Sequence, residues 1–216
     1  MLQMNGRIPM ATNLLSQTSK MPCKSISLDA LLCNTGSVLA QIPGTPCHKC
    51  YALRGFYNMP SVKLAMDKRL TFMTSKHFIE RMVYLLANEE LFRWFDSGDI
   101  QSEQMGNDII EVCEQTPWCT HWLPSKEYKM WRNILRTRVL PANVCLRLST
   151  PMDDAIPVNG FKHTATTYNT KDSLSYVGFK CQAHKNKTYN CGSCRACWDN
   201  KVSNIAYPKR YERKVA

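Results

Sequence analysis

The sequence predicts an α/β fold, an incomplete (β/α) barrel-like parallel sheet that carries a Cys-rich C-terminal lobe. Two observations lead to this prediction. Short segments of strand type alternate along the chain with amphipathic helical segments, as in parallel strands joined by right-handed crossovers. Polar residues also follow the ends of successive predicted strands, and in a parallel sheet these ends share one edge, where sites are assembled.

The predicted strands are short and are separated by helix or turn signals. A brief alternation of apolar and polar residues predicts a half-buried strand over residues 20–28. Later strands are expected over residues 91–95, 120–123, 144–148, 163–168 and 176–180. Helices are expected over residues 60–89, in two pieces, over residues 102–115, and from residue 128. Because only about five of these strands are clear, an open sheet is expected rather than a closed barrel.

The chain divides into two expected parts. Residues 1–180 should form the α/β partial-barrel domain with an N-terminal cysteine-containing loop, in which residues 33–36 and 43–46 are turn signals. Residues 181–216 should form a cysteine-rich, metal-binding segment packed on that domain. A chain of 216 residues, 44% of them hydrophobic, is long enough to bury one full core.

Positive charge is concentrated at both ends of the chain. The net charge of +11 divides into +6 for residues 1–80, −2 for residues 81–179 and +7 for residues 180–216. Basic ends of this kind can attract nucleic acid or an acidic protein, and they can equally offset the negative charge of a metal cluster. No apolar run is long enough to span a bilayer and no signal-peptide pattern is present, so a cytosolic protein without a membrane partner is expected.

The C-terminal cysteines carry the strongest motif. Eleven cysteines in a cytosolic chain favour metal or redox use over disulfides. Cys181, Cys191, Cys194 and Cys197 have the spacing Cx9CxxCxxC, in which three thiolates can converge on one centre and a fourth completes the set. This spacing favours a [4Fe-4S] cluster, with zinc as the alternative and unligated thiols as a third interpretation. Trp198, directly after the run, could shield a cluster or fill core.

A second group of cysteines lies in the N-terminal loop. Cys33, Cys47 and Cys50 have the spacing Cx13CxxC, and a cubane held by three cysteines would keep one iron open to a small ligand. The alternatives are zinc shared with His48, a redox-active dithiol, cysteines that only pack, or an additional ligand to the C-terminal cluster.

Polar residues at the predicted strand ends suggest a pocket. Asp96 and Asp99 follow the strand over residues 91–95, Lys126 and Glu127 follow the next strand, and Arg147 ends the third. If the strands are parallel, these five side chains face one rim. Each of them alone is equally well explained as a helix cap, a turn residue or an ion-pair partner. No catalytic residue is assigned.

Six sequence blocks resemble the "gene product 88" proteins of bacteriophages. The blocks occur in order over nearly the whole chain, at residues 20–25, 33–36, 47–57, 92–99, 122–128 and 191–199. The resemblance implies a phage-encoded protein that acts in the cytoplasm of the bacterial host. A weaker likeness connects the chain to radical-SAM-type proteins, which combine a partial barrel with cysteines after the first strand and use S-adenosylmethionine (SAM). Their usual spacing is CxxxCxxC, whereas thirteen residues separate Cys33 from Cys47 here.

Three hypotheses for the function follow. The first is an iron–sulfur protein that transfers electrons from its C-terminal cluster to or from a redox partner in the host. The second is a radical-SAM-like enzyme with a reactive cluster in the N-terminal loop. The third is a zinc-stabilised protein that binds nucleic acid through its basic termini.

Overall fold

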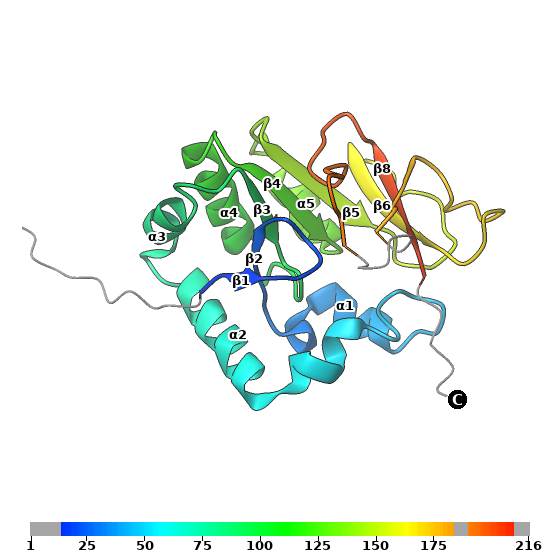
Figure 1. Cartoon of the computed structure of the whole chain (residues 1–216), viewed down its shortest axis with the longest axis horizontal. Coiled ribbons are helices and arrows are strands. Elements are labelled where there is room, and N and C mark those ends of the chain that lie inside the picture. Colours follow the sequence, from blue (N-terminus) through cyan, green and yellow to red (C-terminus); the bar gives the residue numbers. More distant parts are fainter. Residues whose placement is uncertain (1–13, 184–189, 210–216) are drawn as a thin grey trace, which may run out of the picture.

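The computed structural model describes residues 14–183 and 190–209. These residues form one open sheet of eight strands in the order β1-β2-β3-β4-β5-β6-β8-β7 (Figure 1). The strands are β1 (Ser16–Gln17), β2 (Lys24–Ile26), β3 (Leu91–Trp94), β4 (Thr120–Ser125), β5 (Val144–Ser149), β6 (His163–Tyr168), β7 (Phe179–Lys180) and β8 (Asn204–Pro208). Every neighbouring pair is parallel except β1 with β2. The predicted open and mainly parallel α/β sheet is therefore confirmed.

The helices lie mostly between β2 and β5. The α-helices are α1 (Asn34–Ala40), α2 (Pro60–Met73), α3 (Phe78–Leu85), α4 (Glu103–Gln115) and α5 (Tyr128–Ile134), and the short 3-10 helices are η1 (Ala30–Leu32), η2 (Tyr51–Leu53) and η3 (Gly55–Asn58). Pro60 takes the first helical turn of α2, where its missing N–H costs nothing. Ser102 caps α4 by accepting a hydrogen bond from Met105 N at 3.1 Å. The predicted helices are confirmed, but the predicted turn at residues 33–36 is wrong, because α1 begins there.

The helices cover one face of the sheet with a large apolar core. Alternate residues of the strands point to this face, such as Phe92 and Trp94 of β3 and Leu146 of β5. They pack against α3, α4 and α5, whose inward side chains include Phe78 and Trp131. Figure 1 shows α3 and α4 on this side of the strands. Cys113 of α4 is fully buried in the same core, where its helical spacing from Met105 and Ile109 places it on the inward face.

The opposite face is covered by the chain between β7 and β8. Trp122 of β4 contacts Trp198 edge-on, with ring centroids 5.2 Å apart, and a second apolar cluster forms around this pair. The Trp198 indole also donates to Phe92 O at 2.9 Å, which fixes the C-terminal segment against β3. The segment, orange in Figure 1, lies across the strands from the side opposite to α3 and α4. The sheet is therefore enclosed by helices on one face and by cysteine-bearing chain on the other.

The C-terminal strand joins the chain after the cysteines to the main sheet. β8 lies between β6 and β7, with five residue pairs to β6, so the chain after the cysteines returns into the main sheet. A separate C-terminal lobe is therefore not confirmed. The predicted strand over residues 176–180 is reduced to the edge strand β7. Among the described residues, no helix is long and apolar enough to cross a membrane.

Buried His121 predicts an acid sensitivity. Its Nε2 lies 2.9 Å from Thr116 Oγ1, which itself donates to Val112 O, so Nε2 carries the proton and the ring is neutral. Burial lowers the pKa of His121 to about 4. Because the unfolded ring takes up a proton near pH 6.5, stability present above that pH is lost as the pH falls towards 4, by up to about 3 kcal/mol.

The measurement is the free energy of unfolding against pH for the wild type and His121→Leu. Burial raises the pKa of Asp99 to about 7, which stabilises the fold as the pH falls and so opposes the histidine. The difference between the two proteins isolates His121. As the pH falls from 6.5 to 4, the free energy of unfolding of the wild type should decrease relative to that of the variant. A constant difference over this range would show that His121 does not cause the acid sensitivity.

Candidate metal and ligand site

The C-terminal cysteines surround a small cavity against the sheet. Cys181, Cys191, Cys194 and Cys197 all line it, together with apolar residues that include Trp198 and Ile205, and its volume is about 20 Å³. Cys191 N is anchored to Lys20 O at 2.9 Å, and Cys181 N to Ala206 O at 2.9 Å. The structure thus brings the four predicted ligands to one cavity. Cys181 precedes residues 184–189, which lie outside the described chain, and the other three cysteines follow them.

Arg147 clamps this cysteine segment to β5. The side chain is fully buried, and its guanidinium donates to Cys197 O, Ala196 O and Asp199 O at 3.0 Å each. Among the described residues it forms no ion pair with a carboxylate. Arg147 therefore does not line the pocket predicted for it at the rim. It holds the backbone that presents Cys197, and it leaves a buried positive charge beside the cysteines.

Arg93 lies between the two groups of cysteines. Its guanidinium stacks over the Trp122 ring at 4.4 Å, and its Nη1 contacts Met21 Sδ at 3.2 Å. The Arg93 charge lowers the pKa values of the Cys191 and Cys197 thiols, although burial raises both overall. Arg93 also lines the cavity that contains the N-terminal cysteines. Its Nε is buried and has no hydrogen-bond partner within the described chain.

The N-terminal cysteines line a larger cavity at the carboxyl edge of the sheet. Its volume is about 220 Å³, and Cys33, Cys47 and Cys50 contribute to one wall. Gly36 explains how two of these cysteines approach each other. A Cβ at Gly36 would lie 2.8 Å from Cys33 Cβ, so a side chain there would displace Cys33, which lies with Cys47 Sγ around this glycine.

Asp96, Asp99 and Lys126 line the same cavity, as the strand-end pattern predicts. Asp99 accepts hydrogen bonds from Ser125 Oγ at 2.7 Å, Lys126 N at 2.7 Å and Ile100 N at 2.8 Å. These bonds lower the pKa of Asp99, but burial outweighs them and raises it to about 7. Lys126 Nζ donates to Thr150 O at 2.7 Å, and burial lowers the pKa of this ammonium group. A buried acid and a half-buried amine thus face the cysteine loop.

Glu127 supports the cysteine loop from outside the cavity. Its carboxylate accepts from Thr35 N at 2.8 Å and from Thr35 Oγ1 at 2.7 Å, in the first turn of α1. The negative charge caps the helix that follows Cys33, which explains why residues 33–36 start a helix instead of forming a turn. Of the five predicted pocket residues, Asp96, Asp99 and Lys126 line the cavity, whereas Glu127 and Arg147 fix the two cysteine segments.

The turn after β3 is tightly constrained. Phe95 has a positive φ of 50°, and Gly98 has a φ of 84°. A Cβ at Gly98 would lie 2.7 Å from Leu28 Cβ and 2.9 Å from Leu28 O, because the turn packs directly on the chain leaving β2. Asp96 is held in this turn by Ser25 Oγ at 2.8 Å and Tyr57 OH at 3.0 Å. The strained backbone places Asp96 and Asp99 on the cavity wall.

Gly98→Ala should destabilise the protein more than Gly160→Ala. Both glycines have a positive φ, 84° and 82°, so both substitutions cost about 1 kcal/mol in backbone strain. Only Gly98 lacks space for a methyl group, and overpacking adds about 1 to 3 kcal/mol. Chemical denaturation of the two variants measures this difference, and equal losses of stability would rule out the close contact with Leu28.

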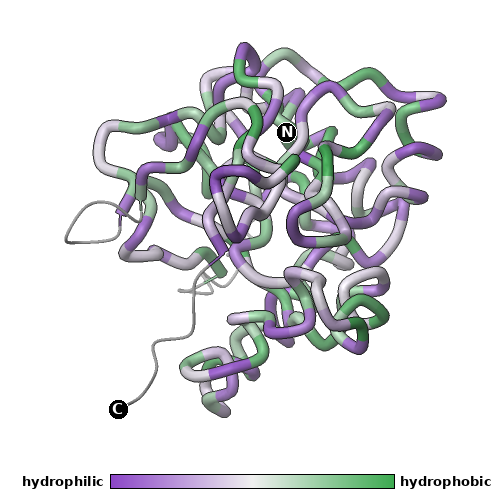
Figure 2. Tube along the Cα trace, turned by 90° about the vertical axis from the view of Figure 1, so that its right-hand side faces the viewer, coloured by the Kyte–Doolittle hydropathy of each residue, from purple (hydrophilic) through white to green (hydrophobic). Residues whose placement is uncertain are grey.

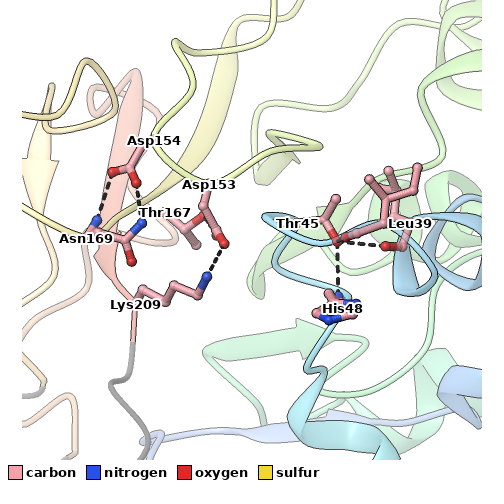
Figure 3. A network of polar contacts seen from close by, with 9 residues as sticks. Leu39, Thr45, His48, Asp153, Asp154, Thr167, Asn169 and Lys209 are labelled. Atoms are coloured by element: carbon pink, nitrogen blue, oxygen red, sulfur yellow. Dashed lines mark hydrogen bonds and ion pairs between the residues drawn. The ribbon is translucent and has the colours of Figure 1, made fainter.

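Two loops beside the N-terminal cysteines are fixed by the polar contacts in Figure 3. Thr45 Oγ1 donates to Leu39 O at 2.7 Å and accepts from His48 N at 3.0 Å. These two bonds fix the conformation of the backbone on both sides of Thr45, next to Cys47. In the loop after β5, Asp153 accepts from Thr167 Oγ1 at 2.7 Å and pairs with Lys209. Because Asp153 N also donates to Gly44 O at 2.8 Å, the two loops are joined.

The thiols of each group lie close enough to influence one another. Burial raises the pKa of Cys33, and the neighbouring Cys50 and Cys47 raise it further. Burial likewise raises the pKa of Cys191, with a further contribution from Cys181. Within the described chain, however, no group of three or more His, Cys, Asp or Glu side chains is arranged to hold a metal ion. His48 Nδ1 lies 3.1 Å from Ala40 O, and its role as a zinc ligand stays a prediction.

Three important residues were not predicted from the sequence. Arg93 lies in the middle of a strand, and nothing in its position distinguishes it from an ordinary solvent-facing residue. Tyr51 and Tyr57 bind Asp96 from the cysteine loop, at a separation of 45 and 39 residues. The signal that could have found them is the tyrosine-rich run directly after Cys50.

Comparison with known proteins gives a family but no solved relative. The model of the family described as Gene product 88 matches residues 2–200. A stretch of 70 residues is 40% identical to the cytochrome P450 monooxygenase sthF of Phaeosphaeria nodorum, and it covers 31% of this chain but only 14% of that protein. No solved structure matches the chain. Because the family model covers most of the sequence, the chain belongs to the Gene product 88 family, a family of bacteriophage gene products.

Proposed function

We propose that the protein is an iron–sulfur redox protein with its principal [4Fe-4S] cluster held by Cys181, Cys191, Cys194 and Cys197. The observation that carries this proposal is the cavity lined by all four cysteines and by no other residue that commonly binds a metal. A single ion needs its ligands to converge on one point, whereas the thiolates of a cubane bind different iron atoms and stand farther apart. The Cx9CxxCxxC spacing of the cysteines is the reason to prefer a cluster over zinc at this cavity.

The buried charges support the same proposal. Arg147 is completely buried and forms no ion pair with a carboxylate within the described chain, whereas the half-buried Arg93 has the charge of Asp96 nearby. Buried cations without a counter-charge are costly. Thiolate ligands would supply negative charge beside both guanidinium groups, and hydrogen bonds and positive charge around a cluster tune its reduction potential.

Access from the surface is consistent with electron transfer. Cys194 lines the enclosed cavity and also an open depression of about 580 Å³ on the outer surface, beside Arg195 and Phe179. A redox partner in the host cytoplasm could approach the cluster at this depression. A fully ligated cluster there would exchange single electrons without binding a substrate itself.

A second candidate function is an enzyme whose reactive cluster is held by Cys33, Cys47 and Cys50. The specific observation in its favour is the position of these cysteines, which follow β2 and share a 220 Å³ cavity with Asp96, Asp99 and Lys126. Three cysteines leave one iron of a cubane free to bind a small ligand such as SAM. In this cavity, Lys126 and Asp99 would orient the polar groups of the ligand, and the apolar wall of Phe95 would limit access of water.

Electron paramagnetic resonance of the anaerobically reduced protein tests both assignments. If both groups of cysteines hold a cluster, the wild type should show two cluster signals, and a variant with Cys33, Cys47 and Cys50 all changed to alanine should keep one of them. SAM should shift only the signal that this variant lacks, with 5′-deoxyadenosine formed if SAM is cleaved. A triple variant with the spectrum of the wild type would refute the second cluster, and loss of both signals would refute independent sites.

A further inference from the structure

The loop with Cys47 and Cys50 continues into an exposed surface that mixes aromatic and basic side chains. Phe56 is 81% exposed and Tyr51 is 59% exposed, although aromatic rings of this size usually lie in the core. Lys49 and Arg54 are exposed on the same segment. We call these four residues, together with Lys63 at the start of α2, the aromatic–basic surface. Figure 2 shows polar and apolar residues alternating along the helical part at the bottom of the molecule.

The segment that bears the aromatic–basic surface carries positive charge. Contacts link η2 with η3 and η3 with α2, so the elements on this segment pack against one another. No Asp or Glu occurs between residues 30 and 66, whereas three Lys or Arg residues do. The middle of the chain, in contrast, carries a net negative charge over residues 81–179. A polyanion is therefore attracted to this part of the protein in preference to the rest of the sheet domain.

Tyr51 connects the surface to the cavity of the N-terminal cysteines. Its hydroxyl donates to Asp96 O, so the ring is fixed, and it lines the cavity while more than half of it remains exposed. Tyr57 packs edge-on against it, with ring centroids 5.8 Å apart. The result is a rigid aromatic face at the mouth of a 220 Å³ cavity.

We propose that the aromatic–basic surface binds single-stranded nucleic acid. Bases stack on Phe56 and Tyr51, and Lys49, Arg54 and Lys63 lie near the phosphates, which is the combination that binds single strands without strong sequence preference. A base unstacked at Tyr51 faces the cavity and its polar side chains. The proposed nucleic-acid surface lies on the cysteine loop. Binding of nucleic acid there does not require that either group of cysteines binds iron.

The test is binding of a labelled oligodeoxythymidine and a labelled oligouridine to the full-length protein at several salt concentrations. The affinity of at least one strand should fall with salt, and Lys63→Gln should reduce the slope of log affinity against log salt by about 0.7. Phe56→Ala should weaken binding about 5- to 100-fold, as loss of one stacked base does. Comparison of the two strands distinguishes DNA from RNA.

Tyr84→Ala provides the matched control. Tyr84 is 73% exposed on α3, away from the aromatic–basic surface, so its loss should leave the affinity unchanged. Because Phe56 and Tyr84 are both exposed, both variants should keep the thermal stability of the wild type. The proposal is overturned if neither strand binds at low salt, or if Phe56→Ala and Tyr84→Ala bind equally well. Either result would refute nucleic-acid binding at the aromatic–basic surface.

Discussion

Replacing Cys194 with alanine should remove the C-terminal cluster, and with it about four iron atoms per chain. Cys194 is one of four cysteines that line the enclosed cavity, and it is the one that also reaches the open depression. Loss of one thiolate leaves one iron without a protein ligand, and the C-terminal cavity of about 20 Å³ has less room for a replacement ligand than the 220 Å³ cavity of the N-terminal cysteines. The measurement is iron and acid-labile sulfide per chain after anaerobic purification, with the absorption near 400 nm as a second readout.

Cys113→Ala is the matched control for this prediction. Cys113 of α4 is fully buried in the core and belongs to neither group of cysteines. The variant should retain the full iron content, even if the smaller side chain reduces the stability of the fold. Equal iron loss from Cys113→Ala and Cys194→Ala would show that iron depends on folding alone and that the ligand assignment is wrong.

Arg147→Met should destabilise the protein by about 3 to 5 kcal/mol, the cost of leaving several buried hydrogen-bond acceptors without donors. Three carbonyls of the cysteine segment receive their hydrogen bonds from this side chain. Methionine fills a similar volume but cannot donate, so the segment should detach from β5 and the C-terminal cluster should be lost. Urea denaturation gives the stability, and iron analysis gives the occupancy.

Two further variants separate the clamp from a general charge effect. Arg147→Lys keeps the charge but lacks the planar fork of donors, so it should recover only part of the stability. Arg138→Met removes an exposed ion pair with Glu114 and should cost less than about 1 kcal/mol. If Arg147→Met were no more damaging than Arg138→Met, the clamp would have no energetic importance.

The sequence was sufficient to predict the parallel sheet and part of the cavity. Asp96, Asp99 and Lys126 could be placed because parallel strands end at one edge, and their chain positions alone fix that edge. The two groups of cysteines could be separated because each has its own local spacing, which does not depend on the rest of the fold. Cys113 could be assigned to the core from its helical periodicity.

The remaining features depend on contacts between distant parts of the chain. Glu127 caps α1 across 92 residues, and Arg147 reaches the cysteine segment across about 50, so neither role leaves a local pattern. β8 was missed because its five residues include Asn204 and Pro208, which are poor strand formers, and pairing with β6 outweighs that tendency. Tertiary contacts also turned a predicted loop at residues 33–36 into α1.

Metal analysis of the wild-type protein tests the central assignment most directly. After anaerobic expression and purification, we expect brown protein with iron and sulfide in equal amounts, about four of each if only the C-terminal cysteines hold a cluster and about eight if both groups do. Colourless protein that contains zinc and no iron would contradict it.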